Sequence, residues 1–229
     1  MGEQISIAIG NDQFGAYLAK PTTALRGGVI VIQEIFGVND DIKATADWLA
    51  DEGYLALAPD LFWRQERHVS LSAANDADVQ KAFSLMIGYD DDLGIRDIQA
   101  SIDYLRDQGC PKIGTIGFCL GGRMVYLSAC RTDADAHASY YGVGIQDMLD
   151  EARDITAPTL IHIAGADEFV PPEAQAAIAE GLAAHNQVEV HIYQGKDHAF
   201  ARHNGMHYDA AATKLAHERT LTLFSEALT

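Results

Sequence analysis

The spacing of hydrophobic residues along this chain changes several times, and each change predicts the start of a new helix or strand. Apolar and polar residues alternate over 4–21 around the turn residues GNDQ, which predicts an opening β-hairpin. The continuous apolar run GGVIVIQE at 27–34 is typical of a strand buried on both faces of a parallel sheet. Residues 39–53 begin with capping side chains, keep a helical apolar spacing and stop at Gly53, which predicts a helix.

Strands and helices are expected to alternate through the rest of the chain. Strands are predicted over 54–59, 112–117, 137–144, 157–165 and 188–195, and helices over 76–87, 92–108, 120–130, 171–186 and 208–228. The stretch 60–90 has weaker periodicity and is interpreted as a loop and a helix that pass over a site. This alternation predicts an α/β fold with a mainly parallel central sheet and helices on both faces. No linker or repeat interrupts it, so residues 1–229 are expected to form one domain.

The charge balance narrows the range of partners. The chain has a formal net charge of −17, and no basic run offers phosphate contacts, so neither nucleic acid nor an anionic membrane is an expected partner. A small-molecule substrate is expected instead, and an anionic one would need a local cation. The sequence leaves the choice between a monomer and a small homo-oligomer open.

The cysteines and the apolar runs bear on the cellular compartment. Cys110, Cys119 and Cys130 are odd in number and match no disulfide or zinc spacing. No signal peptide is visible, and no apolar run reaches the roughly 18–20 residues that span a bilayer. These features predict a cytoplasmic protein with reduced thiols, in which Cys110 and Cys130 are structural.

Three residues with complementary chemistry each follow a predicted strand. Cys119 lies in GFCLGG, Asp167 in GADEFVP and His198 in KDHAF. Their order along the chain, nucleophile, acid and then histidine, is that of the α/β-hydrolase catalytic triad. Because parallel strands end at one edge of the sheet, the three side chains are expected to converge there.

Each residue type suits a separate task. Glycines on either side of Cys119 allow a sharp strand-to-helix turn, and the N-terminus of the following helix favours a thiolate. His198 would take and return the proton, while Asp167 would fix its tautomer. The backbone N–H groups of Leu120 and Ile35 are the expected oxyanion donors. Read singly, Cys119 is a small packed residue, Asp167 a helix cap and His198 a loop histidine; the combination favours catalysis.

Glu34 follows a strand that is expected to be buried, and an ionised carboxylate there needs a partner. One interpretation is an ion pair with a nearby arginine. The other is contact with the Cys119 thiol, which a carboxylate would keep from ionising. His198, His203 and His207 lie close together in sequence, but no acidic ligand pattern accompanies them, so no metal is expected.

The chain resembles the dienelactone hydrolases, the carboxymethylenebutenolidases of the α/β-hydrolase fold. The resemblance spans nearly the whole sequence. It rests on QEIFGVN, APDLFWRQ, GFCLGG, YYGVG, GADEFVP, HAFAR and ERTLTLF. It implies a Cys119–His198–Asp167 triad, oxyanion donors at Leu120 and Ile35, and a resting contact between Glu34 and Cys119 that substrate releases. It also implies a carboxylated enol lactone as substrate, opened to maleylacetate without a cofactor.

The substrate-binding positions match this family less completely. Arg202 corresponds to one of the arginines that hold the substrate carboxylate, and Tyr141, Phe83 and Phe36 are candidate pocket residues. The second arginine is absent: its position corresponds to Val79, so Lys81 or Arg64 would have to compensate. A family aromatic is replaced by Met86, and Ala199 stands where the family has a small hydroxyl residue.

These departures leave three functions to compare. The leading hypothesis is a hydrolase that opens a dienelactone through a thioacyl-enzyme. A Cys-dependent esterase or lactonase acting on a different, neutral substrate is the alternative within the same chemistry. A ligand-binding or redox-sensing protein that uses Cys119 as a reactive thiol is disfavoured, because such a protein has no need of Asp167 and His198 in this order.

Overall fold

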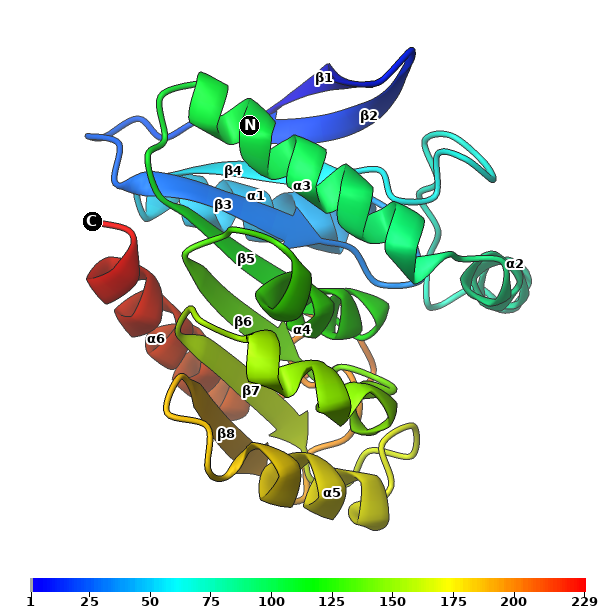
Figure 1. Ribbon diagram of the computed structural model, residues 1–229. Coiled ribbons are helices and arrows are strands. Elements are labelled where there is room, and N and C mark those ends of the chain that lie inside the picture. Colours follow the sequence, from blue (N-terminus) through cyan, green and yellow to red (C-terminus); the bar gives the residue numbers. More distant parts are fainter. Residues whose placement is uncertain (1) are drawn as a thin grey trace.

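The computed structural model describes residues 2–229 and has one eight-stranded sheet at its centre (Figure 1). The strand order is β1-β2-β4-β3-β5-β6-β7-β8. The strands are β1 (Glu3–Ile9), β2 (Asp12–Ala19), β3 (Gly27–Ile32), β4 (Tyr54–Pro59), β5 (Ile113–Phe118), β6 (Ala136–Tyr140), β7 (Thr159–Ala164) and β8 (Val188–Tyr193). The first two form the predicted antiparallel hairpin, β2 joins β4 antiparallel, and the pairs from β4 to β8 are parallel. The α/β class and the mainly parallel sheet are thus confirmed.

Helices cover both faces of this sheet. They are α1 (Asp40–Asp51), α2 (Asp76–Ile87), α3 (Asp91–Asp107), α4 (Leu120–Arg131), α5 (Pro172–Leu182) and α6 (Ala210–Ala227). In Figure 1, α3, α4 and α5 lie over one face and α1 and α6 over the other, while α2 stands apart beyond the edge to which the arrowheads point. The side chains of Asn39, Asn75, Asp90 and Asp209 cap the helices that follow them.

The central strands form the core. Every residue of β3, β4, β5 and β7 is buried, as expected for parallel strands covered on both faces. One element was not expected from the sequence, a 3₁₀ helix η1 (Ile145–Asp154) after β6. No helix within residues 2–229 combines the length and apolarity that crossing a bilayer requires.

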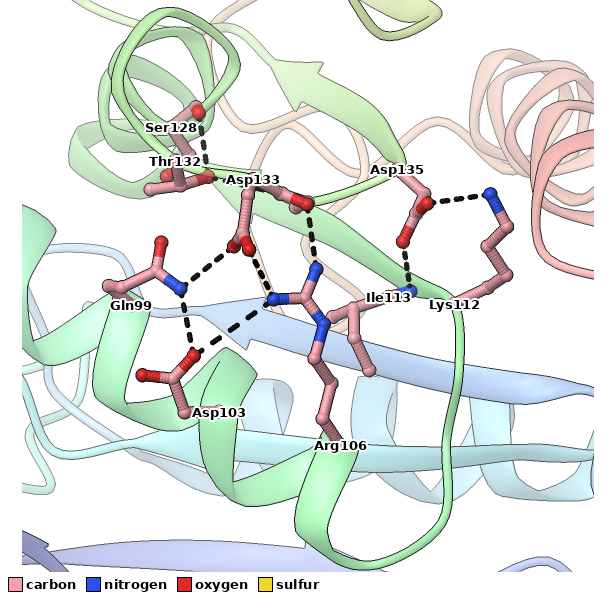
Figure 2. Close-up of polar contacts among 10 residues, drawn as sticks. Gln99, Asp103, Arg106, Lys112, Ile113, Ser128, Thr132, Asp133 and Asp135 are labelled. Carbon is pink, nitrogen blue, oxygen red and sulfur yellow. Dashed lines mark hydrogen bonds and ion pairs between the residues drawn. The ribbon is translucent and has the colours of Figure 1, made fainter.

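A polar cluster fixes the end of the sheet opposite the candidate site (Figure 2). Arg106 of α3 pairs with the side chain of Asp133 in the loop after α4 and donates to its backbone oxygen at 2.8 Å. Gln99 donates to the same Asp133 side chain at 2.8 Å. Asp135 accepts from the Ile113 N–H at 2.9 Å, at the start of β5. These contacts join α3, the start of β5 and the loop that leads into β6. They therefore fix the positions of these three segments relative to one another.

Buried histidines lie on both faces of the sheet: His162 of β7 lies beneath α6, whereas the His137 ring of β6 faces the opposite side, 2.9 Å from the Thr115 hydroxyl. His162 of β7 is fully buried, with its two ring nitrogens within 2.9 Å of the Tyr193 hydroxyl and 3.2 Å of the Thr220 hydroxyl. Burial lowers the pKa of His162 well below its ordinary value of 6.5, and burial also lowers the pKa values of His137 and His217 to about 4.

We expect His137, His162 and His217 to make the stability of the fold sensitive to mild acid. Because these pKa values are lowered in the folded state, the unfolded chain binds more protons as the pH falls through 6.5 toward 4. The associated stability is complete above pH 6.5 and is lost over that window, at about 1–3 kcal/mol per histidine. Urea unfolding between pH 7.5 and 5 measures the slope. His162→Gln should make the free energy of unfolding less dependent on pH, whereas the control variant His207→Gln, at an exposed site, should not. An equal pH dependence in the unmodified protein and both variants would refute the role given to His162.

Candidate active site

The carboxyl ends of four parallel strands bring the predicted site residues to one edge of the sheet. Cys119 follows β5, Asp167 follows β7 and His198 follows β8. Glu34 follows β3, which is the neighbour of β5. Side chains from distant parts of the sequence therefore meet because parallel strands all end on the same side.

Cys119 occupies a sharp turn between β5 and α4. Its backbone has φ 56° and ψ −113°, a conformation that L-residues rarely adopt and that costs about 1–3 kcal/mol. Its N–H donates to the Tyr140 carbonyl at 3.0 Å, which anchors the turn to β6. The cysteine caps the N-terminus of α4 without a side-chain capping hydrogen bond, so the sulfur is not used to complete the helix.

Two glycines let the turn pack against neighbouring backbone. A Cβ on Gly117 would lie 2.3 Å from the Gly121 carbonyl oxygen, and one on Gly121 would lie 2.4 Å from that of Ile32. Both distances are too short for any side chain. The glycine spacing around Cys119 is therefore required by the close approach of β5, α4 and β3.

Asp167 and His198 form a buried hydrogen-bonded pair. The His198 Nδ1 lies 2.7 Å from the Asp167 Oδ2, and the Asp167 Oδ1 accepts the Phe169 N–H at 2.9 Å. With Nδ1 engaged by the carboxylate, Nε2 is the ring nitrogen available to another group. The Phe169 ring packs edge-on against the imidazole, with centroids 4.9 Å apart. The carboxylate and the aromatic ring together fix the orientation of His198.

The charge state of His198 follows from its neighbours. Burial alone would lower the pKa of the imidazole. The negative charges of Cys119 and Asp167, and hydrogen bonds to both side chains, outweigh that effect and raise the pKa of His198 to about 10. The neighbouring carboxylate and sulfur thus favour the protonated, imidazolium form of the ring. Such a pair suits proton transfer to a leaving group.

Glu34 forms an ion pair with Arg202, one of the two arrangements that the sequence left open. The Arg202 Nε and Nη2 donate to the two carboxylate oxygens at 2.7 and 2.9 Å. Glu34 is 3% exposed, so the pair is almost dry. The Arg202 guanidinium also lies over the Phe36 ring, 5.0 Å from its centroid. Both carboxylate oxygens therefore face the arginine, and the contact with the Cys119 thiol is not the one seen here.

A cavity of about 730 Å³ opens onto Cys119 and His198. Ile35, Phe36, Phe83 and Arg202, which were candidates for an oxyanion donor and for substrate contacts, line it. Leu120 is the first residue of α4, so its N–H has no acceptor within the helix and is oriented as an N-terminal donor. The donors expected for an oxyanion thus come from the segments that follow β3 and β5.

Tyr141 is placed differently from the expectation that it lines the substrate pocket. It is fully buried and borders a smaller cavity behind Arg202, with its ring edge-on to His198 at 5.1 Å. Burial and the charge of Glu34 raise the pKa of its phenol well above 10. The ring of Tyr141 therefore packs against His198 and is not among the side chains that line the large cavity.

Neither residue suggested as a replacement for the missing arginine reaches the cavity. Arg64 forms a two-pronged ion pair with the buried Asp97 and stacks on Trp63, 4.2 Å from the ring centroid. Lys81 pairs with Glu66 on the surface at 2.6 Å. Both side chains are therefore committed elsewhere, and the compensation considered from the sequence is wrong for this arrangement.

Several residues of the cavity had no sequence signature. Val143 follows β6, Phe169 follows Asp167, and residues 73–74 precede α2. Phe169 was detectable only as part of the string around Asp167, because nothing in its spacing distinguishes a wall residue from a packed one. Across residues 2–229, no group of three or more His, Cys, Asp or Glu side chains is arranged to hold a metal ion.

Comparisons with known proteins identify the family of the chain. The model of the "Dienelactone hydrolase family" matches residues 14–228. A "Putative carboxymethylenebutenolidase" of Azospirillum brasilense is 41% identical over 98% of each chain. The carboxymethylenebutenolidase of Pseudomonas putida is 37% identical over 91% of this chain and 89% of its own. The crystal structure titled "Putative Dienelactone Hydrolase" from Klebsiella pneumoniae superposes with a TM-score of 0.88 and 28% identity, over 99% of this chain and 98% of that one. The chain is a hydrolase that belongs to the dienelactone hydrolase family.

Proposed function

We propose that this protein hydrolyses small lactones or esters with Cys119 as nucleophile, His198 as acid and base, and Asp167 as the group that orients His198. The observation that carries the proposal is the His198 imidazole, hydrogen-bonded to the Asp167 carboxylate and lining the same cavity as Cys119. A nucleophile, a base and an orienting carboxylate within reach of one another are the parts that acyl transfer requires.

The reaction proceeds in two halves. The Cys119 sulfur attacks the carbonyl carbon, the carbon–oxygen bond to the leaving group breaks, and His198 gives its proton to that oxygen. The product of this half is a thioacyl-enzyme and, for a lactone, the leaving group stays attached as the other end of the acyl chain. His198 then takes a proton from water, the hydroxide attacks the thioester, and the carboxylic acid leaves as the sulfur recovers its electron pair.

Charge on the carbonyl oxygen is to be stabilised by the N–H groups of Leu120 and Ile35. Both donors belong to backbone at strand ends that pack closely through Gly121, so their positions are fixed before substrate arrives. Preorganised donors of this kind are among the largest contributors to acyl-transfer catalysis.

A dienelactone is the first substrate to test, because the curated relatives named above are carboxymethylenebutenolidases. Its carboxylate would have to compete with Glu34 for Arg202. A second candidate, an esterase or lactonase for neutral substrates, is supported by the pairing of Arg202 with Glu34 and by the distant positions of Arg64 and Lys81.

The ultraviolet absorbance of a dienelactone mixed with the purified protein tests the first candidate. We expect the absorbance to fall with a KM of about 1 mM, at the upper end of ordinary enzyme values, because Glu34 already occupies the arginine. p-Nitrophenyl acetate serves as the comparison ester. If that ester is turned over and the dienelactone is not, the second candidate replaces the first.

A further inference from the structure

The cavity at Cys119 has mainly apolar walls. Its volume of about 730 Å³ lies within the roughly 300–1,000 Å³ of sites that enclose drug-sized ligands. The apolar side chains that line it include Phe36, Val79, Phe83, Met86, Val143 and Phe169. A dienelactone, a single five-membered ring with one short acidic arm, would leave most of this surface in contact with water.

One helix provides a complete apolar face to the cavity. Val79, Phe83 and Met86 of α2 lie four and three residues apart, so they project from the same side of the helix. Phe83 is 37% exposed, and Phe169, another of the lining residues, is 44% exposed. Large apolar side chains that stay partly exposed within a concave site are a mark of ligand binding.

The charges around the cavity do not favour an anion. Among the described residues that line the cavity, Arg202 is the one lysine or arginine. Two nitrogens of its guanidinium already donate to the two carboxylate oxygens of Glu34. Glu168 and Asp197 line the same cavity and add negative charge. The net charge of −17 acts in the same direction at longer range.

We propose that the preferred substrates of this site are neutral esters or lactones that carry a bulky apolar group, a six-carbon alkyl or aryl substituent, held against the α2 face of Val79, Phe83 and Met86. The inference rests on the proposed Cys119 chemistry and specifies its substrate class. Removing apolar substrate surface from water at these walls supplies the selectivity.

Two pairs of esters test the preference in the unmodified protein. In p-nitrophenyl hexanoate and acetate the acyl side varies, and in cyclohexylmethyl acetate and ethyl acetate the alcohol side varies, at similar leaving-group reactivity within each pair. We expect kcat/KM to be about 10-fold or more higher for the bulkier member of at least one pair. Ratios near one in both pairs, with p-nitrophenyl acetate still hydrolysed, would overturn the inference and leave the proposed function standing.

A matched pair of variants on α2 locates the selectivity. Phe83→Ala should lower the ratio of bulky to small ester kcat/KM by about 10-fold, because the wall loses its largest side chain. Ile87→Ala serves as the control, since Ile87 lies on the same helix, is 81% exposed and is outside the cavity lining. An unchanged ratio in Phe83→Ala also overturns the inference. If no ester is hydrolysed but the dienelactone is, the inference fails and the proposed function stands; if neither is hydrolysed, both fail.

Discussion

Cys119→Ala is expected to reduce kcat/KM for p-nitrophenyl acetate by about 10⁴-fold to 10⁶-fold, the range found when single members of a catalytic triad are removed. The sulfur lies at the mouth of the cavity, beside an imidazolium whose pKa of about 10 depends on that sulfur and on Asp167. No other cysteine can replace it, because Cys110 is fully buried elsewhere and Cys130 lies at the far end of α4. Steady-state kinetics on the purified variant give the measurement.

Cys130→Ala provides the control for this experiment. It removes a thiol from the same helix without touching the cavity, so its kcat/KM should stay within about twofold of the unmodified protein, as for other substitutions away from a site. Circular dichroism then shows that both variants are folded. Substantial activity in Cys119→Ala would contradict the proposed mechanism and would favour a protein that uses this cysteine as a sensor or ligand-binding thiol.

Arg202→Met is expected to lower the free energy of unfolding by about 3–5 kcal/mol at neutral pH, because it leaves the buried Glu34 carboxylate without its cation. The methionine preserves much of the packing over Phe36, so the loss of charge dominates. Urea denaturation measures the change. Few single substitutions in the chain should cost as much, since changes above about 4 kcal/mol need a mechanism of this kind.

Two further variants distinguish the effect of the unpaired charge from the effect of lost packing. The double variant Glu34→Gln with Arg202→Met should recover part of the lost stability, because no uncompensated charge remains. Lys81→Met breaks the exposed pair with Glu66 and should cost at most about 1 kcal/mol. If the double variant is no more stable than Arg202→Met, the unpaired carboxylate is not the cause of the loss.

The strands and the sharp turn at Cys119 were predictable because local patterns determine them. Continuous Val and Ile runs mark β3, and the glycines around Cys119 mark a turn that no larger residue could form. The convergence of Cys119, Asp167 and His198 then follows from parallel topology alone. The sequence-based expectation of the fold was confirmed for this reason.

Pairings between distant residues were not predictable in the same way. Glu34 and Arg202 lie 168 positions apart, and the sequence left the partner of Glu34 undecided. Arg64 looked free to bind substrate, but Asp97 on α3 holds it. Tyr141 was a candidate pocket residue because of the family string YYGVG, yet its side chain is buried in the core. These outcomes depend on which side chains meet across the fold, and spacing along one segment carries no information about that.

The cavity walls come partly from the loops that hold the reacting groups and partly from a separate helix, α2. Cys119, Asp167 and His198 are fixed by strand ends, whereas the apolar face opposite them belongs to α2, which stands outside the layers of the sheet (Figure 1). Ala82 and Leu85 of α2 are buried, but the cavity-facing positions Val79, Phe83 and Met86 lie apart from the strand ends. Substitutions at these three positions would reshape the cavity while Cys119, Asp167 and His198 keep their places, so the size of the accepted substrate can be changed independently of the reacting groups.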